Sequence, residues 1–62
     1  MKIQPKENYS MQGYGRLNKT KVYEAVLATN QPNHKEQGLV FVLPNDDLKI
    51  ELLLKASEYV RV

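Results

Sequence analysis

Apolar positions are concentrated in the last two thirds of the chain. Twenty of the 26 apolar residues lie between Val22 and Val62, whereas residues 1–20 mix amides, lysines, glycines and one proline with isolated tyrosines and methionines. A polar segment of this kind has little apolar surface with which to offset the entropy cost of ordering it. We therefore expect residues 1–12 to form a flexible N-terminal lead-in and residues 13–62 to form a single small domain.

Three stretches have the pattern of β-strands. Residues 21–29 are rich in β-formers and have apolar side chains on both faces of an extended chain, as in a central strand. Residues 39–43 form a continuous apolar run between a glycine and a proline, which is too short for a helix and is typical of a buried strand. Residues 59–62 alternate like a closing strand, and the polar residues 30–38 predict an exposed loop.

Residues 46–60 admit two interpretations. A strand over residues 49–55 would point alternate apolar side chains inward and leave only Leu53 on the polar side. A helix would begin at Asn45 as its N-cap and would collect most apolar residues on one face, but Lys49 would lie inside that face. The pattern favours the strand, and a helix over residues 46–60 stays the alternative.

These strands predict an all-β fold, a small barrel of four or five short strands, because closure protects edges that an open sheet of this size would expose. The inward register places Val26, Phe41 and Leu52 in the core. A core in so short a chain supplies only about 3–5 kcal/mol. The chain has no cysteine for a disulfide, and His34 is its one histidine, so a zinc cage is nearly excluded. Its stability must come from topology or from self-association.

The order of these segments resembles a known family. It runs from Gly15 to Val26, through a polar loop, an apolar strand and an Asn-Asp-Asp turn, to a second apolar strand and residues 59–62. This order is similar to that of small Src-homology-3-like barrels, in particular those in short uncharacterised bacterial and bacteriophage proteins. The resemblance covers about residues 15–62, and Thr20 and Leu48 stand where the family usually has glycine. It implies a small Src-homology-3-like barrel and no particular activity.

Charge is unevenly distributed along the chain, whose net charge is +2. Residues 1–35 contain six Lys or Arg and two Glu, whereas the remainder contains three Lys or Arg and five acids. In the basic half, Tyr14 lies among Arg16, Lys19 and Lys21, and such a mixture can stack bases while its cations contact phosphates. We therefore take these four as candidate binding residues, with nucleic-acid binding as the alternative function. A denser basic stripe is usual for such modules.

No combination of residues predicts catalysis, a metal site or a cofactor. His34 is alone in its loop, the acidic pair Asp46-Asp47 lacks further oxygen ligands at suitable spacing, and no serine or threonine has a histidine in local register. The apolar runs are too short to span a membrane, and the lack of cysteine agrees with a reducing compartment. We expect a non-catalytic cytoplasmic module that binds a protein partner or itself, with no cofactor, small-molecule substrate or membrane association.

Overall fold

The computed structural model describes residues 1–62 and is nearly all β. Strands are connected by turns, one single-turn α-helix and one 3₁₀ turn. The elements in chain order are β1 (Lys2–Pro5), β2 (Tyr9–Met11), β3 (Gly15–Leu17), β4 (Tyr23–Leu27), α1 (His34–Gln37), β5 (Val40–Val42), β6 (Leu52–Leu54), the 3₁₀ turn η1 (Ala56–Glu58) and β7 (Tyr59–Arg61). None of the helical segments has the length and apolar character needed to cross a membrane.

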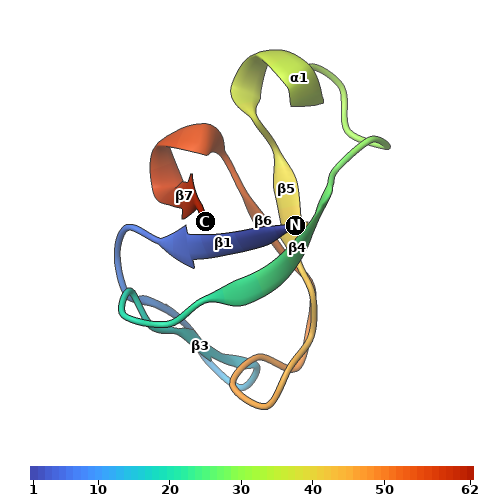
Figure 1. The fold of residues 1–62 in the computed structure, drawn as a ribbon. Coiled ribbons are helices and arrows are strands. Elements are labelled where there is room, and N and C mark those ends of the chain that lie inside the picture. The colour runs from blue at the N-terminus through green and yellow to red at the C-terminus, as the bar shows by residue number, and fades with distance from the viewer.

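Five of the strands form one antiparallel sheet in the order β6-β5-β4-β1-β7, which curls into a half-barrel (Figure 1). The other two, β2 and β3, form a hairpin that lies across the lower end of the half-barrel in Figure 1. A bridge between Gly15 and Leu48 joins this hairpin to the loop that precedes β6. The predicted small all-β fold is confirmed, but it has seven strands instead of four or five, because β1 and both strands of the hairpin are additional.

The expectation of a flexible lead-in over residues 1–12 is wrong. Strand β1 lies inside the sheet, where Ile3 pairs with Tyr23 of β4 on one side and with Arg61 of β7 on the other. The Ile3 side chain is fully buried, and Pro5 is buried two positions later on the same face. The polar composition of the first twelve residues as a whole conceals the alternation of buried and less buried positions along β1. The strands that pair with β1 lie too far away in the sequence to be inferred from these residues.

The strand interpretation of residues 46–60 is confirmed, and the helix is wrong. The strand is shorter than expected, because β6 covers only Leu52–Leu54. The residues before it form a turn in which Leu48 is fully buried, and η1 follows after Lys55. At η1 the Glu58 carboxylate accepts a hydrogen bond from the Lys55 N–H at 3.0 Å, which satisfies the backbone donor at the start of this 3₁₀ turn.

The core is formed by the side chains that the strands and the hairpin direct into the half-barrel. Its buried members are Ile3, Leu17, Tyr23, Ala25, Val40, Val42, Leu48 and Leu54. Leu52, which was predicted to be in the core, is half-buried and packs against this cluster. The Tyr23 hydroxyl accepts the Asn18 N–H at 2.9 Å, so the one hydroxyl of the core has a partner at its margin.

The placement of Val26 and Phe41 in the core is wrong. Val26 is 44% exposed and Phe41 is only half-buried, because both lie on the outer face of the sheet. Glu24 is on the same face of β4 as Val26, two residues away. Its carboxylate would be costly to bury without a partner, so Glu24 faces solvent and Val26 faces outward with it. Ala25 and its neighbour Val42 therefore face inward.

Candidate functional site

The four candidate residues lie on the β2–β3 hairpin and on the turn that leads into β4. Tyr14 is at the tip of the hairpin and is 51% exposed. Its N–H donates to the Met11 carbonyl at 3.0 Å, and its carbonyl accepts the Lys49 N–H at 2.7 Å. The backbone of Tyr14 is therefore fixed by both neighbouring segments, while its ring is accessible from solvent.

Lys21 is already engaged within the molecule. Its Nζ lies 3.0 Å from Oδ2 of Asp47, and the Tyr23 hydroxyl approaches the same oxygen at 3.4 Å. The hydrogen bond to Asp47 and the negative charge of that carboxylate raise the pKa of Lys21. The same hydrogen bond lowers the pKa of Asp47, against an opposing effect of partial desolvation. Lys21 would have to give up this pair in order to contact a phosphate.

Arg16 and Lys19 are exposed and have no ion pair. The backbone N–H of Arg16 donates to the Asp47 carbonyl at 2.9 Å, which places Arg16 beside the Lys21–Asp47 pair. Lys19 is fixed through its backbone, because its N–H donates to Asn8 Oδ1 at 2.9 Å and its carbonyl accepts from Gln4 Nε2 at 2.8 Å. All four candidates thus lie on the hairpin and the turn that follows it, and two of the three cations are unpaired.

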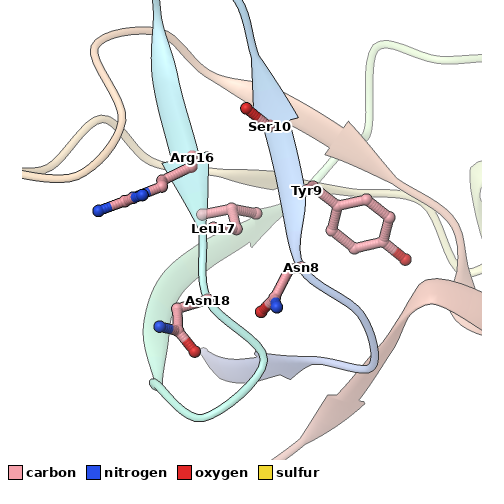
Figure 2. A pocket seen from close by; sticks show the side chains of 6 residues that line it. All are labelled: Asn8, Tyr9, Ser10, Arg16, Leu17 and Asn18. Atoms are coloured by element: carbon pink, nitrogen blue, oxygen red, sulfur yellow. The ribbon is translucent and has the colours of Figure 1, made fainter.

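A shallow hollow of about 340 Å³ lies along the hairpin. Its lining residues are Asn8, Tyr9, Ser10, Arg16, Leu17 and Asn18 (Figure 2). In Figure 2, Arg16 leaves β3 on the side away from β2, whereas the Tyr9 ring leaves β2 on the opposite side. Of the four candidate residues only Arg16 lines this hollow, and the pairing of Ser10 with Arg16 in the hairpin was not predicted from the sequence.

The polar groups of the hollow are mainly hydrogen-bond donors. The Oδ1 atom of Asn8 accepts from Lys19, and that of Asn18 accepts from the N–H and hydroxyl of Thr20 at 2.9 and 2.7 Å. The two amide NH₂ groups and the Arg16 guanidinium have no acceptor within the chain. Donors without acceptors suit a small acidic group, although every one of these side chains is exposed to competing water.

A second surface lies on the outer face of β4, β5 and β6. Val26 pairs with Phe41, and Phe41 pairs with Leu53, so the three side chains form a cross-strand row, which we call the outer apolar row. Val26 is 44% exposed, Leu53 is 39% exposed and Phe41 is half-buried. Single exposed apolar residues are common, but three directly adjacent ones form a continuous apolar strip.

The remaining titratable side chains are not arranged as a metal site. His34 begins α1, and its Nδ1 lies 3.2 Å from the Gln31 carbonyl oxygen, within the same loop. Nowhere in the chain do three or more His, Asp or Glu side chains gather closely enough to hold a metal ion.

Comparison of the chain with models of protein families, with curated proteins and with solved structures gives no match.

Proposed function

We propose that the chain is a non-catalytic interaction module that docks on a protein surface, another copy of itself included, through the outer apolar row. The observation that supports this proposal is the adjacency of Val26, Phe41 and Leu53 across three strands. In an antiparallel sheet with one face in water, outward positions are normally polar. Covering this row would remove apolar surface from water at a gain of roughly 25 cal/mol for each Å² buried.

The finer fold assignment belongs to the same proposal. A Src-homology-3-like barrel is supported by the five-stranded antiparallel half-barrel, by the β2–β3 hairpin between β1 and β4, and by the 3₁₀ turn between β6 and β7. A bacterial or bacteriophage origin and a cytoplasmic location stay predictions from the sequence. The proposed docking does not depend on either of them.

Site-specific photo-crosslinking tests the docking proposal. A photoreactive amino acid replaces Leu53 in one variant and Val60 in a control, since Val60 is 50% exposed on the other edge strand. Expressed in the source cells, the Leu53 position should give one reproducible adduct, identified by mass spectrometry, that the Val60 position does not give. Absence of an adduct at Leu53, or the same mixture at both positions, would overturn the proposal.

Nucleic-acid binding is the second candidate function. The favourable observation is that Tyr14 is 51% exposed at the tip of the hairpin, while Arg16 of β3 and Lys19 of the following turn are unpaired. Accessible aromatic rings and free cations are the groups with which proteins bind single-stranded nucleic acids. We rank this function second because the third cation, Lys21, is held by Asp47.

A further inference from the structure

Strand β6 is an edge of the sheet with an unpaired backbone. The bonds from Ala28 N–H to the Leu39 carbonyl and from Leu43 N–H to the Glu24 carbonyl show that odd-numbered residues of β5 bond to β4. The even-numbered residues of β5 therefore bond to Leu52 and Leu54, with which they are in register. The N–H and C=O of Leu53 consequently point away from the sheet.

This edge is short, but it lacks the other features that usually prevent pairing with another chain. Natural edge strands are protected by their shortness, by a central charge, by a proline or by a bulge. Strand β6 consists of three leucines, and Leu53 at its centre is 39% exposed. The unpaired backbone group and the end of the outer apolar row therefore coincide at one residue.

The charges that flank β6 are self-complementary. Glu51 and Lys55 lie two positions before and after Leu53, and both are exposed and free of ion pairs. Four residues of extended chain separate them by about 13 Å, so they cannot pair with each other. In an antiparallel pair of two copies centred on Leu53, Glu51 of each copy lies opposite Lys55 of the other.

The other edge strand does not have this property. On β7 the even-numbered residues bond to β1, so the same operation must be centred on Tyr59 or on Arg61. A pair centred on Tyr59 places Glu58 opposite Val60, and a pair centred on Arg61 places two arginines opposite each other, so neither brings opposite charges together. The complementarity is thus specific to β6.

We propose that a second copy of this chain docks at the β6 end of the outer apolar row, joined edge to edge through β6 in a two-fold antiparallel pair centred on Leu53. This inference rests on the proposed docking function and names its partner. The two Leu53 residues exchange backbone hydrogen bonds, and the apolar row of one copy continues into that of the other. The backbone hydrogen bonds between the two copies end at Leu53, because the Lys55 N–H and carbonyl are already bonded to Glu58. So small a contact gives a weak dimer that forms at high concentration.

Reversing the charges of Glu51 and Lys55 tests the two-fold antiparallel arrangement of the pair. Sedimentation equilibrium of the wild-type chain, from about 10 µM to about 1 mM at low salt, should detect a monomer–dimer equilibrium. Lys55→Glu and Glu51→Lys each place like charges opposite one another and should weaken the dimer roughly tenfold. The double variant E51K/K55E restores both pairs in reversed order and should dimerise like the wild type. A mixture of the two single variants should form a heterodimer, since each supplies the charges that the other lacks.

Two further variants distinguish specific pairing through β6 from non-specific association of exposed apolar residues. Leu53→Lys should abolish the dimer, whereas Val60→Lys, with the same added charge on the other edge strand, should leave it unchanged. Circular dichroism melts establish that each variant is folded. A dimer that all the charge variants and Leu53→Lys leave intact would overturn the pairing through β6.

The outcomes also separate this inference from the proposed function. A chain that stays monomeric at about 1 mM but crosslinks to a different protein through Leu53 would refute self-pairing and leave the docking function standing. A monomer that also gives no adduct at Leu53 would refute both.

Discussion

Lys21 and Asp47 form an ion pair, with Nζ 3.0 Å from Oδ2, that links the turn before β4 to the loop before β6. No other pair of side chains in the structure makes a salt bridge. The hydrogen bond from Lys21 holds the pKa of Asp47 below its ordinary value of 3.8. The stability that this carboxylate contributes is therefore present above the pKa of the unfolded chain and is lost as the pH falls through the lower pKa of the folded state.

Asp47→Asn should flatten the acid side of the stability profile. The melting temperature of the wild type should fall more steeply than that of the variant as the pH drops below 3.8, so that the two converge in acid. The difference should be modest because the pair is partly exposed. Melts followed by circular dichroism across the acid range measure it. Asp46→Asn is the matched control, since the Asp46 side chain has no ion pair, and parallel curves for Asp47→Asn and wild type would contradict the argument.

On the alkaline side, the stability contributed by the ion pair depends on pH with the opposite sign. The pKa of Lys21 is raised above 10.5 by the hydrogen bond and charge of Asp47. Its contribution to stability is complete below the pKa of the unfolded chain and is lost only as the pH rises through the higher folded-state value. Between these two limits the pair contributes a constant amount, so neutral pH is on the plateau.

Ile3→Ala should destabilise the protein severely, although Ile3 lies in the polar N-terminal segment. The side chain is fully buried, on a strand that is paired on both sides. Its truncation should lower the free energy of unfolding by about 2–5 kcal/mol, which is comparable with the whole stability of a core of this size. Urea denaturation measures the loss. Ile3→Val should cost about 0.5–1.5 kcal/mol, and a wild-type midpoint for Ile3→Ala would show that β1 is dispensable.

Gly15→Ala should be more damaging than Gly13→Ala. Both glycines have positive φ, of 119° and 84°, so alanine is strained at either position. A Cβ at Gly15 would in addition collide with the Asp47 carbonyl oxygen, whereas a Cβ at Gly13 would enter open space. We expect a loss of about 1–2 kcal/mol for Gly13→Ala from backbone strain alone and a larger loss for Gly15→Ala. Equal thermal shifts for the two variants would mean that the contact between the hairpin and Asp47 is not maintained in solution.

Titration with labelled single-stranded oligonucleotides tests the second candidate function. Two unpaired cations, Arg16 and Lys19, predict a slope of log affinity against log salt of roughly −1.4, from about 0.7 per phosphate contact. Lys19→Ala should weaken binding for all sequences alike, whereas Lys21→Ala should have little effect because Asp47 already holds that ammonium. Tyr14→Ala should remove a further 1–3 kcal/mol, roughly, if a base stacks on the ring. No binding at low salt would exclude this function.

The strands at residues 23–27, 40–42, 52–54 and 59–61 could be predicted from the sequence because each coincides with an apolar or β-branched run. Which side chains face inward could not be predicted in the same way. In β5 every residue is apolar, so no alternation distinguishes Val40 and Val42, which are buried, from Phe41, which is not. The residue that distinguishes the two faces is in the neighbouring strand β4, where the charged Glu24 faces solvent and so identifies the outer face.

The candidate site shows the same limit. The exposure of Tyr14 follows from its place between two glycines in a turn, and this could be anticipated. The pairing of Lys21 with Asp47, 26 residues away, depends on the bridge that brings the hairpin to the loop before β6. No local pattern predicts such a contact, so three equivalent cations were expected where the structure has two.

The pairing of β1 with strands from distant parts of the chain constrains the order in which this chain can fold. Strand β1 pairs with β4 and with β7, and the Val62 N–H donates to the Lys2 carbonyl at 3.0 Å. The sheet therefore cannot be completed by local hairpins alone, because β1, from the start of the chain, pairs with β7, from its end. Closing a loop of nearly the full chain length costs entropy before the contacts that repay it exist. Folding should be slow for so small a protein, because the pairing of β1 with β7 joins the two ends of the chain.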